Sequence, residues 1–483
     1  MALQCRLYLV NSSTVKGGNV TESKHKLITW RAVSDSFMAV VILVVVILYS
    51  GFGKPIWIDE FLHFSLGAMN FSEATTALNQ SLGGGVNWGQ TPTLFLLDHL
   101  LLENFGANLW VLRLPSIIAG FLLIMLAVYF LRMRGVGRLF QWLLIFAFAS
   151  QGSLMFYVGE ARPYMLMAST AVALLVFFSL GLEQRRTWIG VLVGIYAIVV
   201  GALAHPYWIF FLFLTVVFGV YLRGLRPNSL KSLRRATTEA SPIWIGVGLL
   251  IFAVTAFVSW AKESSTFSTD PYEFIESPIG AVRTLGSTHF GLLGLPPEWA
   301  IENLPNWLNL FNIDRILIFV LVAACVFYLV RDKVQNVDLV PPLVLLGLGV
   351  FSTTVISLVS LVRSYWIVQR QWLGGIAFAT IAIVWLIALL SKRIAKSRVS
   401  LGAAIAAVTA MAIVWNSYIT VSGQIGVVQT HNEVFLEFRQ DTRSEQELIK
   451  FAQETGAWEY VANVNAVRGG PVWRGLALYY GVS

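Results

Sequence analysis

The chain has 483 residues, of which 57% are hydrophobic and only 12% are charged. Charged residues make up about a quarter of an ordinary soluble domain, so this composition excludes a soluble globular protein of the usual kind. The formal net charge is +8, but no cluster of basic and aromatic residues indicates a nucleic-acid partner. The composition predicts a polytopic membrane protein.

Apolar runs that approach the length of a membrane span recur along the whole chain. About 20 apolar residues cross the hydrocarbon core as an α-helix. Eleven runs are candidates, at 36–51, 115–131, 139–157, 164–182, 188–203, 206–222, 242–260, 316–330, 339–362, 372–390 and 401–420. Polar residues fill the chain from Asn11 to Lys26, which is not typical of a cleavable signal sequence. We expect the first span to be an uncleaved anchor.

The distribution of lysine and arginine predicts the orientation. With the N-terminus in the cytoplasm, 21 of the 34 Lys and Arg residues lie on the inner side, eight lie in outer loops and five lie in the C-terminal tail. Short loops rich in these residues face the cytoplasm. We expect a cytoplasmic tail over 1–34, a transmembrane domain over 35–420 and an outer C-terminal segment over 421–483. The protein is expected in a plasma membrane, such as the bacterial inner membrane.

Three outer segments are long enough to fold. In the first outer loop, 52–114, a glycine-rich break at 83–85 separates two helical runs, which predicts short helices along the membrane surface. A second long outer loop covers 261–315. The C-terminal segment combines a helical pattern with a strand-like run at 459–464, which predicts a small α/β segment. The expected fold class is therefore all-α and polytopic, with surface helices and this small addition.

Ionisable residues gather at the predicted outer face, while the centres of the spans carry no charge. Eight such groups are Asp59, Glu60, His63, Glu160, Arg162, His205, Arg363 and Arg370. Transporters place charges inside the bilayer at a cost of about 2.5–3.5 kcal/mol each, so the uncharged spans argue against ion translocation. A carboxylate can accept the proton of an incoming hydroxyl, and arginine can bind a lipid phosphate bidentately. A single base opposite the leaving group predicts inversion at a sugar's anomeric carbon.

Four short motifs within the first half of the chain occur in a distinctive order. They are Trp57-Ile58-Asp59-Glu60, Gln90-Thr91-Pro92-Thr93-Leu94-Phe95-Leu96-Leu97, Leu112-Arg113-Leu114-Pro115-Ser116 and Glu160-Ala161-Arg162-Pro163-Tyr164. The ordered set resembles the GT-C fold, the class that contains protein O-mannosyltransferases and the lipid A aminoarabinose transferase. The resemblance implies a membrane glycosyltransferase with a polyprenyl-phosphate-linked sugar as donor and Asp59 as the leading base. It also implies a lipid, glycan or protein as the acceptor.

The candidate site residues fall into three groups. Asp59 and Glu60 are the catalytic candidates. The donor phosphate is assigned to Arg162, Tyr164, Arg363 and Arg370. Further candidate substrate contacts are His63, Gln90 and His205. No motif has the spacing of a zinc site, so no cofactor is expected, and a divalent metal stays an open alternative. The expected partners are the lipid-linked sugar, its acceptor and membrane lipids, without nucleic acid.

Simpler interpretations exist for these residues. Asp59 and Glu60 suit the first turn of a surface helix and could serve only there. Arg162 could be an interface anchor, although arginine is disfavoured outside. His63 and His205 could be local hydrogen-bonding groups. For the whole chain, the alternatives are a flippase for a lipid-linked sugar and a non-catalytic component of a surface-polysaccharide pathway.

Overall fold

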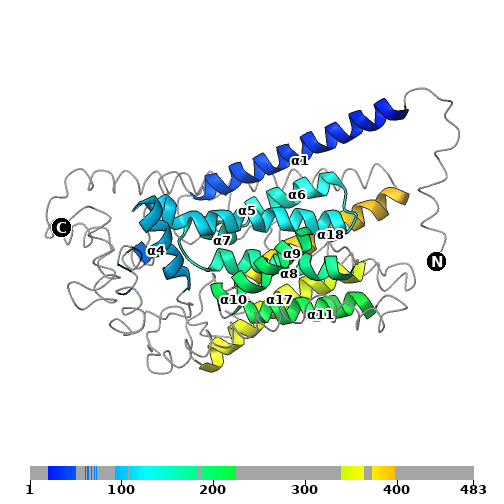
Figure 1. Cartoon of the computed structure of the whole chain (residues 1–483). Helices are drawn as coiled ribbons and strands as arrows, with labels where there is room; N and C mark the ends of the chain where they lie inside the picture. The colour runs from blue at the N-terminus through cyan, green and yellow to red at the C-terminus, as the bar shows by residue number, and fades with distance from the viewer. Residues whose placement is uncertain are drawn as a thin grey trace, which may run out of the picture. The chain divides into compact units, whose positions relative to one another are not determined.

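A computed structural model describes a large part of the chain (Figure 1). The described residues are 20–50, 60, 63–64, 67, 70, 72, 93–106, 108–182, 188–205, 207–224, 339–363 and 372–397. Every regular element in these ranges is a helix. The chain divides into two compact units, Met1–Val44 and Val45–Ser483, so the division falls within helix α1, Val20–Ser50.

Helix α5, Leu109–Met133, has clear beginning and end signals. The Asn108 side chain accepts a hydrogen bond from the Trp110 backbone N–H at 2.8 Å, which satisfies one of the free donors in the first turn. The helix is followed by Gly135, whose φ is 70°, a left-handed conformation that glycine adopts without strain. The Val136 N–H then bonds back to the Leu131 carbonyl, which closes the helix end.

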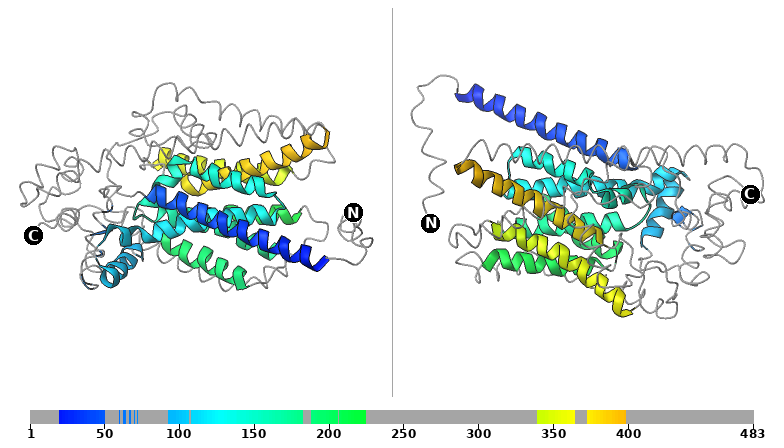
Figure 2. Two further views of the ribbon diagram at one scale, coloured as in Figure 1. Left: turned by 90° about the horizontal axis from the view of Figure 1, so that it is seen from above. Right: turned by 180° about the vertical axis from the view of Figure 1, so that it is seen from behind.

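Helix α8, Tyr164–Leu182, lies at the centre of the described part of the second unit. It packs against α5, against α11, Trp208–Gly224, and against α18, Leu373–Ser397. A helix that is apolar all round is buried, and the side chains of α8 follow this rule. Figure 2 shows the orange α18 running beside the yellow helix α17, Val340–Arg363.

Close backbone approaches join α18 to its neighbours. Helix α17, Val340–Arg363, packs against α18, and a Cβ added at Gly349 would lie 2.8 Å from the Gly375 carbonyl oxygen. Phe211 of α11 meets Phe378 of α18 edge to face, with ring centroids 5.8 Å apart. Tight packing of this kind fixes the relative positions of the helices.

Two of the predicted spans are helical but not regular. The run 139–157 becomes α6, Arg138–Ala149, then α7, Gly152–Met155, and a 3-10 turn, Phe156–Gly159. The run 188–203 becomes α9, Trp188–Ile195, a π-helical turn, Tyr196–Val200, and α10, Gly201–Ala204.

Ser150 follows α6 at the first of these interruptions, and its hydroxyl bonds to the Phe146 carbonyl at 2.7 Å. Such a side chain to backbone bond often bends a helix. At the second, the Tyr196 hydroxyl lies 2.5 Å from Ser169 Oγ of α8.

The described helices coincide with eight of the eleven predicted spans. Three helices in the described residues are long and apolar enough to cross a membrane, namely Val33–Ser50, Leu109–Met133 and Leu373–Ile394. The runs 242–260, 316–330 and 401–420 lie outside the described residues. The same holds for the loop 261–315 and the C-terminal segment 421–483. The total of eleven spans and the small α/β segment therefore remain predictions.

The second predicted surface helix is present as α4, Thr93–Phe105, which begins directly after Pro92. In the first stretch, Glu60, His63, Phe64, Gly67 and Ser72 also have helical backbone, whereas Asn70 does not. Helix α4 packs against α5 and α10 and lies at the ends of the longer helices (Figure 1). The described parts of the four motifs are therefore gathered at one end of the helical bundle.

Candidate functional site

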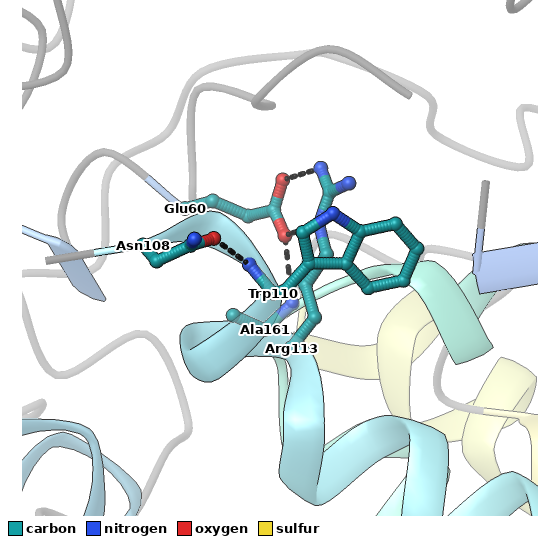
Figure 3. Close-up of polar contacts among 5 residues, drawn as sticks. All are labelled: Glu60, Asn108, Trp110, Arg113 and Ala161. Atoms are coloured by element: carbon teal, nitrogen blue, oxygen red, sulfur yellow. Dashed lines mark hydrogen bonds and ion pairs between the residues drawn. The ribbon is translucent and has the colours of Figure 1, made fainter. Parts of the chain in front are cut away.

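Glu60 is the centre of a buried ion pair. Arg113 Nε donates to Glu60 Oε1 at 2.8 Å, and Arg113 Nη2 donates to Glu60 Oε2 at 2.7 Å. Figure 3 shows the two planar groups facing each other. Glu60 is 0% exposed and Arg113 is 2% exposed. A bidentate pair of this kind fixes both the position and the orientation of the carboxylate.

The Glu60 carboxylate also binds a third part of the chain. Glu60 Oε1 accepts a further hydrogen bond from the Ala161 backbone N–H at 2.8 Å. A second link runs from Ser116 Oγ to the Arg162 carbonyl at 3.2 Å. Three of the four sequence motifs therefore meet at Glu60, although they are separated by 53 and 101 residues along the chain.

The sequence alone predicted no functional role for Arg113, although this residue lies in one of the four motifs. Its only sequence signal is its position in an outer loop, where arginine is disfavoured. The cap at Asn108 starts α5 one turn before Arg113, and Figure 3 shows the cap beside the ion pair. The cap thereby helps to set the direction from which the guanidinium reaches Glu60.

His63 and Asp98 form a second buried contact. His63 Nδ1 and Asp98 Oδ2 are 2.5 Å apart, and both side chains are fully buried. The imidazole also stacks on Phe95, with ring centroids 4.2 Å apart. Burial, and secondarily the charge of Glu60, raise the pKa of the Asp98 carboxyl well above its ordinary value. Asp98 was not among the predicted site residues, because its burial depends on the packing of α4 and not on its neighbours in the sequence.

Arg162 and Tyr164 lie together at the start of α8. The Arg162 guanidinium carbon is 5.7 Å from the centroid of the Tyr164 ring, a cation–π distance. Arg162 is fully buried and Tyr164 is 2% exposed. A buried guanidinium is an unusual feature in a helical membrane protein and is typical of a functional site.

His205 continues this group of side chains. Its ring centroid is 5.3 Å from that of Tyr164. The Tyr207 backbone N–H donates to His205 Nδ1 at 3.1 Å. Because Nδ1 accepts, the neutral imidazole carries its proton on Nε2, which makes that atom a donor. The structure thus brings Arg162, Tyr164 and His205 together, as three of the predicted site residues.

The contacts of the other predicted site residues lie outside the described part of the chain. Asp59, Gln90 and Arg370 lie outside the described residues, and Arg363 is described only as the last residue of α17. Within the described ranges, no group of three or more His, Cys, Asp or Glu residues could hold a metal ion.

Comparison with known proteins concerns the fold. No family model and no curated protein sequence matches the chain. The crystal structure of ArnT from Cupriavidus metallidurans in the apo state is similar, with a TM-score of 0.50 and 11% identity. The likeness covers 86% of this chain and 82% of ArnT, a GT-C enzyme. The chain has the GT-C fold. This confirms the resemblance that the four motifs indicated.

Two further GT-C structures show weaker likeness. ArnT from Cupriavidus metallidurans bound to undecaprenyl phosphate has a TM-score of 0.46 and 12% identity, over 86% of this chain and 82% of that one. The archaeal oligosaccharyltransferase AglB from Archaeoglobus fulgidus was solved in complex with an inhibitory peptide and a dolichol-phosphate. It has a TM-score of 0.41 and 12% identity, over 86% of this chain and 59% of AglB. The GT-C fold and the apolar helices together make this chain an integral membrane protein.

Proposed function

We propose that the protein is a GT-C glycosyltransferase that moves a sugar from a polyprenyl-phosphate carrier to an acceptor at the outer face of the membrane. The observation that carries the proposal is the buried Glu60–Arg113 pair with its bond from Ala161. This pair joins three motifs into one site at the end of a GT-C bundle. A structural role alone would not need two buried arginines, Arg113 and Arg162, near two buried carboxyl groups, those of Glu60 and Asp98, since burying charge is costly.

The two adjacent carboxylates take different roles in this proposal. Both oxygens of Glu60 accept hydrogen bonds from Arg113, so Glu60 serves to position the chain around it. Asp59 precedes it in the sequence and is the proposed general base. The acceptor hydroxyl attacks C1 of the sugar, and its proton passes to Asp59. The bond from C1 to the phosphate oxygen breaks, and its electron pair leaves with the lipid phosphate, which gives inversion.

The donor phosphate is proposed to bind beside Arg162. The guanidinium lies against Tyr164, which is in turn in contact with His205, whose Nε2–H is a donor. Arginine can stabilise the charge that grows on the phosphate as the bond to C1 breaks. Arg363 and Arg370 are proposed to add to this group, and Gln90 to contact the substrate. His63 is buried against Asp98, so we assign it a positioning role instead.

Transfer activity of purified protein tests the function. The protein would be incubated with a panel of radiolabelled polyprenyl-phosphate sugars, with total membrane lipids as the acceptor preparation. A transferase converts the donor to free polyprenyl phosphate and moves the label to a product in equal amounts. A flippase in sealed vesicles would move the donor across the bilayer without releasing carrier phosphate. A non-catalytic component would leave the donor unchanged, and either result would contradict the proposal.

A further inference from the structure

His63 and Asp98 form a pair to which the proposed transfer chemistry assigns no substrate contact. The pair is fully buried, and its 2.5 Å separation brings one proton under the influence of both groups. The second carboxyl oxygen, Asp98 Oδ1, is buried and has no hydrogen-bond partner in the described part of the chain. A carboxylate with an unsatisfied buried oxygen is unfavourable, whereas a carboxyl that keeps its proton is tolerated.

The charges around the pair come from three elements. Glu60 is close enough to raise the pKa of Asp98 further, and Arg113 of α5 is held by Glu60. On α4 itself, His99 Nε2 lies 3.5 Å from Glu103 Oε2, whose side chain is 64% exposed. Helix α10 also packs on α4 and contains no titratable side chain, and His205 follows it. Glu60 is thus the charge that Asp98 is most sensitive to.

The segment that carries His63 is held closely against α4. A Cβ added at Gly67 would lie 2.6 Å from Leu102 Cδ1 and 3.4 Å from the Asp98 carbonyl, so the two backbones approach closely. His99 Nδ1 also bonds to the Gly67 carbonyl at 3.1 Å. A change of charge at Asp98 is therefore transmitted to a segment that cannot easily move away from α4.

We propose that His63 and Asp98 are a positioning pair. The two side chains hold one proton between them and thereby preserve the Glu60–Arg113 ion pair during catalysis. The inference rests on the proposed function and deepens it. While the proton is held, the pair is neutral as a whole. When the shared proton is lost, Asp98 becomes a second carboxylate near Glu60. Both carboxylates are then attracted to the positive charge of Arg113. Loss of the proton then weakens the Glu60–Arg113 ion pair. Activity therefore falls at alkaline pH.

The sign of the effect follows from linkage. Folding raises the pKa of Asp98, so the folded protein binds this proton more tightly than the unfolded chain does. The stabilisation is fully present below the ordinary carboxyl pKa of 3.8 and is lost as pH rises through the folded value.

Two substitutions move the alkaline limit in opposite directions. Asp98→Asn keeps the size and can donate its amide to His63 Nδ1, but it cannot ionise. The alkaline fall of kcat/KM should therefore move to higher pH or disappear. His63→Gln leaves the carboxyl without the imidazole that shares its proton, so the fall should move to lower pH by about one unit. His99→Gln on the same helix keeps a donor for the Gly67 carbonyl and should leave the profile unchanged.

Histidine NMR tests the pair without any transfer activity. With ¹⁵N-labelled histidine in the full chain, the His63 signal should change at a higher pH in the wild-type protein than in Asp98→Asn, because in the wild type it reports the loss of the proton shared across the 2.5 Å contact. An equal or lower value in the wild type overturns the inference. An unchanged pH profile in a folded Asp98→Asn variant also overturns it. A wild-type protein without transfer activity would instead contradict the proposed function, while the NMR result still decides the pair.

Discussion

Asp59 and Glu60 are neighbours in the sequence, but their proposed chemical roles differ. Glu60 is engaged with Arg113 through both oxygens, so its replacement should act mainly on folding. Asp59 is the proposed base, and Asp59→Asn keeps its shape but cannot accept a proton. Turnover should fall by about 10²-fold or more, because general base catalysis contributes about that factor. The measurement is single-turnover release of carrier phosphate, with donor binding and thermal stability measured in parallel.

Glu60→Gln is the matched control for this variant. It leaves the buried Arg113 charge with a weaker partner, and breaking a buried pair costs about 3–5 kcal/mol. The amount of folded protein should therefore fall more than the turnover of each folded molecule. If folded Glu60→Gln loses turnover and Asp59→Asn keeps it, the two roles are exchanged.

Arg162 is the residue on which donor binding is predicted to depend most. Hydrogen bonds to charged groups contribute about 1.5–3 kcal/mol, so Arg162→Ala should weaken binding of undecaprenyl phosphate by about 10- to 100-fold. Arg162→Lys should restore only part of the affinity, since lysine lacks the planar fork of the guanidinium. Binding is measured on purified protein by titration with the lipid phosphate. Unchanged affinity in the alanine variant would move the assignment to Arg363 or Arg370.

Single residues also show where sequence reasoning stops. The motifs supplied Glu60, Arg162 and Tyr164, because an acidic pair and an arginine at an outer face are visible locally. The sequence could not reveal that Arg113 binds Glu60, because only the fold brings residues 53 positions apart into contact. Asp98 was missed for the opposite reason, since its burial is a property of α4 docking and not of its own neighbours in sequence.

Helices are the level at which sequence patterns were most informative. Long apolar stretches predict helices directly, because backbone polar groups in a bilayer must be satisfied within the segment. The start of α4 after Pro92 was also visible, as proline favours the first turn of a helix. The interruption after Ala149 and the π-helical turn at Tyr196–Val200 were not visible, because both depend on side chains that bond across or along packed helices.

The turn that ends in Gly159 gives a prediction about packing. A Cβ at Gly159 would lie 2.9 Å from the backbone oxygens of Ser50 and of Tyr49 at the end of α1. Backbone cannot yield as a flexible side chain does, so Gly159→Ala should destabilise the protein by about 1–3 kcal/mol. The residue precedes Glu160 and Ala161, so the bond from Ala161 to Glu60 should weaken as well. Thermal unfolding in detergent measures the change.

Gly347→Ala is the control for Gly159→Ala. Gly347 lies inside α17, and nothing stands within 4 Å of an added Cβ there. Alanine is a better helix former than glycine by about 1 kcal/mol, so this variant should be unchanged or slightly more stable. Equal stability of the two variants would show that the approach of the turn to the end of α1 is not tight in solution.

At the scale of the whole molecule, the fold gives the arrangement of the helices, whereas the charge distribution predicts their orientation in the membrane. The GT-C likeness establishes the arrangement of helices. The proposed site lies where α4, the start of α5, the start of α8 and His205 come together. Which membrane face this end occupies follows only from the lysine and arginine distribution. Reporter fusions measure this orientation directly.

A reporter fusion after Thr420 should be active only outside the cytoplasm, and a reporter within 223–235 only inside. The physical reason is that short loops rich in lysine and arginine stay on the cytoplasmic side, and residues 223–235 hold five of these residues. Alkaline phosphatase is active outside and green fluorescent protein inside, so each position is tested with both reporters. A third fusion within 183–187, where Arg185 and Arg186 stand, should agree with the inner one. Reversed reporters would place Glu60, Arg113 and Arg162 on the cytoplasmic side, and transfer at the outer face would then be excluded while the GT-C fold would stand.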